Sequence, residues 1–204
     1  RAGLLDQVIA WEREGLNVPT ERVRSPPLGK YLDTVLRYYY NDATFDWYTN
    51  RVLDSPALFH GWNNMCLRAM QTAADRGAIT VVERASTHPA VQRRLVEAEY
   101  EQFGIDEGFI HDRLYDRAIA ELNLADAIFV PSSFVYDSFV EEDFDESRLV
   151  EIPFGVDTEQ FRPPDDPGRP DGEFTALFVG ALSLRKGIQY LLPGWQRADV
   201  DGEL

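Results

Sequence analysis

The sequence predicts an α/β fold in which helices cover both faces of a parallel β-sheet. Short and nearly continuous apolar segments alternate with longer helical patterns from Ala57 onward. Glycine and proline punctuate the ends of these segments. Hydrophobic residues make up 44% of the 204 residues, enough for a packed core. Because parallel sheets bind ligands at the carboxyl ends of their strands, the strand exits are where we expect a site.

The elements follow in a regular order. Apolar residues recur at helical spacing over residues 3–14 and 28–40, which predicts two helices before the first strand. Strands are then expected at residues 57–64, 78–86, 127–133, 148–157 and 174–182. Helices are expected at residues 64–77, 87–104, 107–126, 134–142 and 186–195, the last one broken near Pro193. The predicted order is β-α-β-α-α-β-α-β, a proline- and glycine-rich linker, and then β-α.

Composition excludes several classes of partner. The formal net charge of −15 argues against nucleic acid and against a broad grip on anionic lipid, since both need clustered cations. No apolar run approaches the roughly 18 to 20 residues of a membrane span, although peripheral contact with a membrane is left open. The first residues do not form a signal peptide, and the single Cys66 fits a reducing compartment. We therefore expect a cytoplasmic protein.

A phosphate-binding turn is one interpretation of residues 178–187. Gly180 follows an apolar run, and the adjacent cations Arg185 and Lys186 precede Gly187 and a predicted helix. A helix N-terminus attracts anions, and neighbouring cations would add direct charge for a diphosphate. A surface loop with two solvated cations is the alternative. No Ser or Thr follows Lys186, so a magnesium-holding P-loop is excluded.

Histidines mark two further candidates. His88 follows a predicted strand and precedes Pro89 at a helix start, where its ring could donate a hydrogen bond to a sugar hydroxyl or a phosphate. The alternative is a helix-terminal residue without a function. His60, followed by Gly61, is expected at another strand exit, whereas His111 is expected in the middle of a helix, as a surface or packing residue.

The remaining candidates are small polar residues at strand exits. Ser132 or Ser133 is expected to cap the next helix, because a nucleophilic serine would need a G-x-S-x-G turn that is absent. Gly155 and Asp157 follow another strand, and Asp157 is either a turn residue or part of a cleft. The helical glutamates, Glu121 among them, are expected to face water. No zinc or EF-hand spacing occurs, so we expect no metal and no cofactor.

Three segments follow one another along the chain: "LADAIFVPSSFVYDSF", "RLVEIPFGVDTEQFRP" and "FTALFVGALSLRKGIQYLL". Together they resemble the family 4 retaining glycosyltransferases of the GT-B fold. The upstream "HGWNN", "AADRGAITVVERASTHP" and "EYEQFG" resemble one branch of that family, and the resemblance covers most of residues 57–192. It implies two Rossmann-like domains. Residues 1–161 would be an incomplete acceptor-side domain, 162–173 a linker, and 174–204 the start of a nucleotide-sugar-binding domain. The chain is thus expected to be a piece of a longer enzyme, inactive alone.

The resemblance also implies an activity, which is transfer of a sugar from a nucleotide-diphosphate sugar to an acceptor hydroxyl with retained configuration. Lys186 matches the family's diphosphate-binding lysine, Gly180 its strand-exit glycine, and His88 a histidine that faces the donor sugar; no metal is required. Ala181 stands where the family often has arginine, and Arg185 is the candidate to replace that charge. The alternatives are another GT-B enzyme, such as a nucleotide-sugar epimerase or a phosphorylase, or a non-catalytic α/β binding module.

Overall fold

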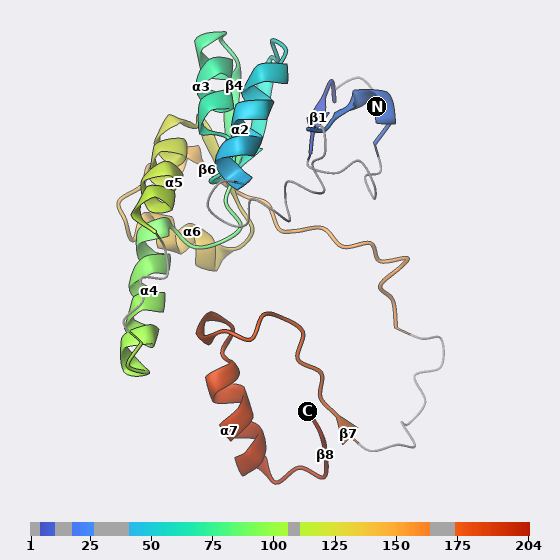
Figure 1. The fold of residues 1–204 in the computed structure, drawn as a ribbon, viewed down its shortest axis with the longest axis vertical. Coiled ribbons are helices and arrows are strands. Elements are labelled where there is room, and N and C mark those ends of the chain that lie inside the picture. Colours follow the sequence, from blue (N-terminus) through green and yellow to red (C-terminus); the bar gives the residue numbers. More distant parts are fainter. Residues whose placement is uncertain (1–4, 11–17, 27–40, 106–110, 164–173) are drawn as a thin grey trace. The chain divides into compact units, whose positions relative to one another are not determined.

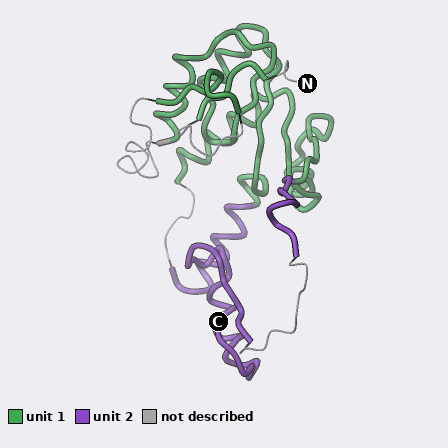
Figure 2. Tube along the Cα trace, turned by 90° about the vertical axis from the view of Figure 1, so that its right-hand side faces the viewer, with its two compact units in different colours: residues 1–91, 110–153 green, residues 92–109, 154–204 purple. Residues whose placement is uncertain are grey.

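The computed structural model describes residues 5–10, 18–26, 41–105, 111–163 and 174–204. The chain divides into two compact units, which Figure 2 shows in separate colours. Unit 1 comprises residues 1–91 and 110–153, and unit 2 comprises residues 92–109 and 154–204. The predicted helix at 28–40 and most of the predicted linker lie outside the described residues. The predicted domain boundary at residue 161 stays a prediction.

Unit 1 contains a parallel sheet of four strands. In spatial order these are β3 (Leu58–Trp62), β4 (Ile79–Glu83), β5 (Ala127–Val130) and β6 (Leu149–Glu151). Trp62 pairs with Glu83, Glu83 with Phe129, and Phe129 with Val150, so the four carboxyl ends are nearly level. The predicted α/β class with a parallel sheet is confirmed.

The helices between residues 41 and 140 are α2 (Asn41–Val52), α3 (Leu67–Asp75), α4 (Pro89–Gln102), α5 (Asp112–Leu124) and α6 (Ser133–Val140), of which α4 continues into unit 2 after Val91. From β3 to β6 their order confirms the predicted one. Figure 1 shows α2 beside α3, and α3 also contacts α5. Only α2 has no predicted counterpart, because its buried face includes the polar residues Asp46 and Thr49.

The core of unit 1 lies between the sheet and helices α3, α5 and α6. Its largest fully buried apolar side chains come from these elements and are Met70, Val82, Leu122, Ile128, Val130 and Phe139. Burying each such side chain contributes about 1.5–3 kcal/mol. Short turns connect the elements: the 3-10 helix η2 (Glu146–Arg148) leads into β6, and Gly77 and Gly104 follow α3 and α4 with positive φ angles.

The predicted helix over residues 3–14 is wrong where the structure describes it. Val8–Ile9 form the strand β1, which pairs in parallel with β2 (Val23–Arg24) after the short 3-10 helix η1 (Thr20–Arg22). Val8 and Ile9 are β-branched, which favours an extended backbone wherever a partner strand is present. Pairing with a distant segment therefore outweighs the local helical spacing.

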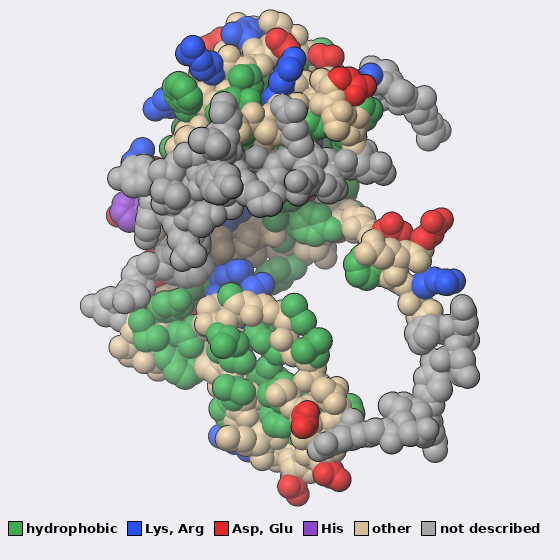
Figure 3. All heavy atoms as spheres, turned by 45° about the vertical axis from the view of Figure 1, so that its right-hand side comes forward, with side chains coloured by type: hydrophobic (Ala, Val, Ile, Leu, Met, Phe, Trp, Pro, Cys, Tyr) green, Lys and Arg blue, Asp and Glu red, His purple; other side chains and the backbone are tan. Residues whose placement is uncertain are grey.

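Unit 2 contains β7 (Phe174–Thr175), the 3-10 helix η3 (Leu184–Lys186), α7 (Ile188–Ala198) and β8 (Gly202–Glu203). The strand predicted over 174–182 is shorter than expected, because β8 offers only two residues for pairing. Hydrophobic side chains of this unit are visible on the surface in Figure 3, and Leu177 and Val179 are each 84% exposed. The predicted break at Pro193 is also wrong, because α7 continues through it.

Within unit 2, α7 packs against the C-terminal part of α4 and the residue that follows this helix. The Gln189 amide donates to the Glu99 carboxylate at 2.7 Å, and the Tyr190 ring lies edge-on to Phe103. At the far end of the helix, Trp195 stacks on Phe174 with ring centroids 6.1 Å apart. Aromatic and amide contacts therefore hold α7 although none of its residues is fully buried.

Candidate functional site

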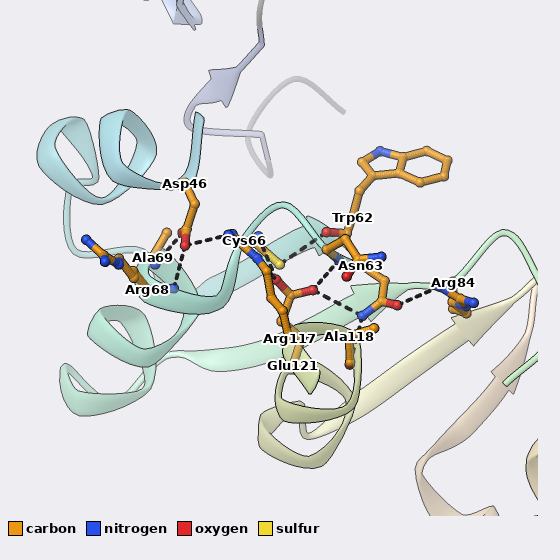
Figure 4. A network of polar contacts seen from close by, with 11 residues as sticks. Asp46, Trp62, Asn63, Cys66, Arg68, Ala69, Arg84, Arg117, Ala118 and Glu121 are labelled. Atoms are coloured by element: carbon orange, nitrogen blue, oxygen red, sulfur yellow. Dashed lines mark hydrogen bonds and ion pairs between the residues drawn. The ribbon is translucent and has the colours of Figure 1, made fainter. Parts of the chain in front are cut away.

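A buried polar network joins the exits of β3 and β4 at the carboxyl edge of the sheet (Figure 4). It begins with Asp46 on α2, which is only 1% exposed. The two carboxylate oxygens of Asp46 accept the backbone N–H groups of Arg68 and Ala69, each at 2.9 Å. The N-cap residue of α3 is Cys66, whose side chain makes no capping bond. Asp46 thus caps α3 from another helix, at the positions that an N-cap side chain would serve.

Glu121 on α5 satisfies the turn before α3 in the same way. It is fully buried, and its carboxylate accepts the backbone N–H groups of Asn64 and, at 3.0 Å, Cys66. It also accepts the Asn63 amide at 3.0 Å and the Arg117 guanidinium at 3.3 Å. Burial raises the pKa of Glu121, and the donors from Cys66, Asn64 and Arg117 oppose that rise. The expectation that Glu121 faces water is wrong.

Arg117 connects the two carboxylates. Its Nη2 atom lies 2.9 Å from Asp46, and its Nε atom donates to Glu121. Backbone N–H groups at the start of a helix would otherwise attract a phosphate. Here Asp46 and Glu121 already occupy three of them, those of Cys66, Arg68 and Ala69, together with the N–H of Asn64 in the turn before, and Arg117 balances part of the negative charge. The turn between β3 and α3 is therefore filled by the protein's own anions.

Asn63 carries the network from the exit of β3 to the exit of β4. Its amide oxygen accepts Nη1 of Arg84 at 2.9 Å, and Nε of Arg84 donates to the carbonyl of Thr87 at 3.0 Å. Arg84 is 7% exposed, and burial lowers its pKa to about 10. The neighbouring indole of Trp62 points away from the network in Figure 4 and is half exposed.

His88 follows this link directly and is 8% exposed. Its backbone N–H donates to the Ser138 hydroxyl at 2.9 Å, and its Nδ1 accepts the N–H of Ala90 at 3.3 Å. The ring lies edge-on to Phe139. Since Nδ1 is an acceptor, the proton of the neutral ring belongs on Nε2. Burial lowers the pKa of His88, which favours the neutral ring, and in the tautomer that its contacts indicate Nε2 is the hydrogen-bond donor.

The other histidines occupy different positions from those expected. His60 is the third of the five residues of β3 and not at its exit, and its Nε2 lies 3.3 Å from the Glu83 carboxylate. At Gly61 a Cβ atom would lie 2.7 Å from the sulfur of Cys66, so packing explains this glycine. His111 is the N-cap of α5, where Nδ1 accepts an N–H group, and not a mid-helix residue.

Two of the small polar candidates have local roles. Ser132 is the N-cap of α6, and its hydroxyl accepts the N–H of Val135 at 3.4 Å. Asp157 accepts the N–H groups of Glu159 and Gln160 at 2.9 and 3.1 Å, which is the pattern of an Asx turn. Gly155 lies nearby in the same exposed segment.

Three of the predicted diphosphate-binding residues, Arg185, Lys186 and Gly187, directly precede α7. Arg185 and Lys186 form the end of η3 and are exposed. Gly187 follows with φ of +78° and serves as the N-cap of α7 without any side-chain cap. Gly180 is also exposed, and a Cβ atom there would meet only the ring of Phe178 at 3.5 Å. A helix N-terminus and two cations are thus adjacent.

The network residues Asp46, Asn63, Arg84 and Glu121 are not among the sequence candidates. One signal could have found Glu121, because it lies three residues after Ala118 on the apolar stripe of α5 and four after Arg117. In the described part of the chain, no group of three His, Cys, Asp or Glu residues could hold a metal ion. None of the described helices combines the length and apolar character that crossing a bilayer requires.

No model of a known protein family matches the chain, and a search of curated proteins found no match either.

Proposed function

We propose that this chain belongs to a retaining glycosyltransferase of GT-B type, which moves a sugar from a nucleotide-diphosphate sugar to an acceptor hydroxyl. Three ordered motifs motivate the proposal, and the parallel sheet of unit 1 is compatible with it. The observation that carries it is the turn before α7, where Arg185, Lys186 and a glycine N-cap meet.

The turn before α7 supports binding of the diphosphate. The positive φ of Gly187 ends η3 and lets α7 begin at the next residue, so the cations directly precede a helix N-terminus. The helix dipole and the backbone N–H groups favour an anion at this point. Lys186 and Arg185 would add charge-assisted hydrogen bonds to phosphate oxygens. Among the described residues no carboxylate accepts an N–H group at the start of α7, in contrast to α3, and Glu99 binds the side chain of Gln189 there.

His88 is proposed to act on the transferred sugar. Its neutral ring would donate a hydrogen bond from Nε2 to a sugar hydroxyl, and it would not serve as a base because its Nδ1 is already an acceptor. In the reaction the bond between the anomeric carbon and the diphosphate breaks, and its electron pair leaves with the diphosphate. The acceptor oxygen bonds to the same face of that carbon and passes its proton to the departing diphosphate. The cations would stabilise the departing charge, which is the main contribution we assign to the protein.

Calorimetric titration with UDP, GDP, ADP and their sugar conjugates tests the proposal. We expect one nucleotide to bind, and Lys186→Ala to weaken its binding about 10- to 100-fold, the equivalent of one lost charge-assisted hydrogen bond. Arg197→Ala is the matched control, because it removes an exposed cation from the opposite end of α7. Equal effects of the two substitutions would remove the assigned role of Lys186. Absence of any nucleotide binding would leave the non-catalytic binding module as the better interpretation.

A further inference from the structure

We propose that Arg84 is a positioning residue that holds His88 in its donor orientation, and that Glu121 and Asn63 fix Arg84 in turn. The orientation of His88 is inferred from its contacts alone. Only its purpose, a hydrogen bond to the transferred sugar, rests on the proposed function.

The first step of the argument is the continuity of the contacts. The Glu121 carboxylate fixes the Asn63 amide, whose oxygen accepts Nη1 of Arg84. Nε of the same guanidinium donates to the carbonyl of Thr87, the residue before His88. One planar group thus joins the exit of β3 to the last peptide before the histidine.

The second step is that the histidine is held from both sides. Its own N–H donates to the hydroxyl of Ser138 on α6, and this hydroxyl also donates to the carbonyl of Val135 at 2.6 Å. The ring packs against Phe139, also on α6. The α6 contacts fix one side of the loop, and Arg84 fixes the carbonyl on the other side. Releasing either side would let the ring leave the position in which Nδ1 accepts the Ala90 N–H.

The third step is the choice of arginine. A guanidinium presents several N–H groups in one rigid plane, so it can reach an amide oxygen and a carbonyl oxygen together. Lysine has one rotating ammonium on a flexible chain and cannot reproduce that pair of directions. Arg84 is only 7% exposed, and burying its charge costs desolvation free energy. An apolar side chain at this position would not carry that cost. A positioning role explains why the guanidinium is there.

Imidazole nitrogen NMR spectra of the protein test this inference without any substrate. The chain has three histidines, so His60→Gln and His111→Gln variants assign the His88 signals. We expect wild-type His88 to be in the Nε2–H form at neutral pH. Arg84→Lys should produce a mixture of the two neutral tautomers and move the His88 pKa toward its ordinary value. Asn63→Ser removes the amide oxygen that accepts from Arg84. It should shift the tautomer ratio and the pKa of His88 in the same direction.

Arg76→Lys is the matched control. Arg76 also holds backbone carbonyls, those of Leu53 and Asp54, but it lies at the C-terminal end of α3. It should lower stability and leave the His88 spectrum unchanged. The inference is overturned if Arg84→Lys leaves the tautomer unchanged, or if Arg76→Lys changes it equally. If Arg84→Lys fails to fold, Asn63→Ser decides, and an unchanged His88 spectrum in that variant overturns the inference.

Nucleotide titrations separate this inference from the proposed function. The predicted diphosphate contacts belong to unit 2, so Arg84→Lys should leave the Kd for UDP or GDP unchanged within about twofold. If no nucleotide binds, the proposed function fails while the NMR result still decides the role of Arg84. If turnover of a nucleotide sugar is found, Arg84→Lys should lower kcat with little change in KM for the donor, which a loss of stability alone would not produce.

Discussion

The N-termini of α3 and α7 are built in opposite ways. At α3 the N-cap side chain makes no bond, and Asp46 from α2 supplies both of the capping oxygens. At α7 the N-cap is Gly187, no side chain of the described residues caps the helix, and two exposed cations precede it. Both ends attract negative charge through the helix dipole. The first attraction is satisfied inside the protein, and the second is the one that we propose a ligand satisfies.

This contrast indicates where an anionic ligand can bind. A phosphate at the start of α3 would have to displace Asp46 and Glu121, which are 1% and 0% exposed and hold two other helices in place. At α7 the cations Arg185 and Lys186 are exposed to water, and the nearby Glu99 carboxylate is bound to the side chain of Gln189 rather than to the helix N-terminus. The same local structure, a turn followed by a helix, thus serves stability in unit 1 and is suited to binding in unit 2.

Among the changes that test the difference between the two helix N-termini, Asp46→Ala is expected to lower the unfolding free energy most. It removes the cap of α3 and leaves Arg117 with one of its two carboxylate partners. Loss of one partner of a buried ion pair costs about 3–5 kcal/mol of unfolding free energy. Urea unfolding followed by circular dichroism measures this. Asp137→Ala, an exposed carboxylate on α6, is the control and should stay within about 0.5 kcal/mol of wild type. A loss below about 1 kcal/mol for Asp46→Ala would mean that the cap is dispensable.

A smaller effect is expected at Gly187. An alanine there finds open space but has to keep φ near +78°, which costs about 1–2 kcal/mol for a residue with a Cβ atom. Hydrogen exchange of the first turn of α7 should therefore become faster. Gly180→Ala is the control, because its backbone is not left-handed and its Cβ would make an ordinary contact. If both glycines tolerate alanine equally, the turn before α7 does not depend on the left-handed residue.

Ser132→Ala removes a cap that the N-cap residue itself supplies, whereas the cap of α3 comes from Asp46 on another helix. The Ser132 hydroxyl accepts one N–H group at 3.4 Å, so its loss should cost about 1 kcal/mol, well below the effect of Asp46→Ala. Ser133→Ala, at the first residue of α6, is the matched control and should be close to neutral. The same unfolding experiment measures both. A larger loss for Ser133 than for Ser132 would contradict the assignment of the cap.

The sequence predicts the order of elements from β3 to β6 because each segment carries its own signal. Alternating apolar strands and glycines after helices are local features, and Gly77 and Gly104 indeed follow α3 and α4 with positive φ. Where the outcome depends on a partner segment, local signals fail. Val8 and Ile9 pair with a strand fifteen residues away, and the residues after Thr175 find no long partner strand among the described residues.

The residues of the candidate site also fall into those that the sequence could predict and those that it could not. His88, Lys186 and Gly187 could be named from the sequence because they directly follow strands or precede helices. The Asp46–Glu121 network could not, because its members come from α2, α5 and the β3 exit, and meet only in the folded chain. A charged residue on a helix is expected to face water unless its buried partners are known. The partners of Glu121 are mostly backbone N–H groups, which carry no sequence signal.

The smallest expected effect is a pH dependence that sharpens the assignment of His88 as a neutral donor. Burial lowers its pKa below the ordinary 6.5; Glu142 opposes this shift and Arg84 adds to it. As pH falls below 6.5, the unfolded chain therefore binds the proton before the folded protein does. The contribution of His88 to stability is constant above that pH and is lost as pH falls through the lowered pKa. Urea unfolding at about pH 7.5 and about pH 5.5 should show a larger loss for wild type than for His88→Gln, because the other titrating groups are common to both. Equal losses would mean that the folded protein accepts the proton as readily as the unfolded chain, and the ring would then not be the neutral donor that its contacts indicate.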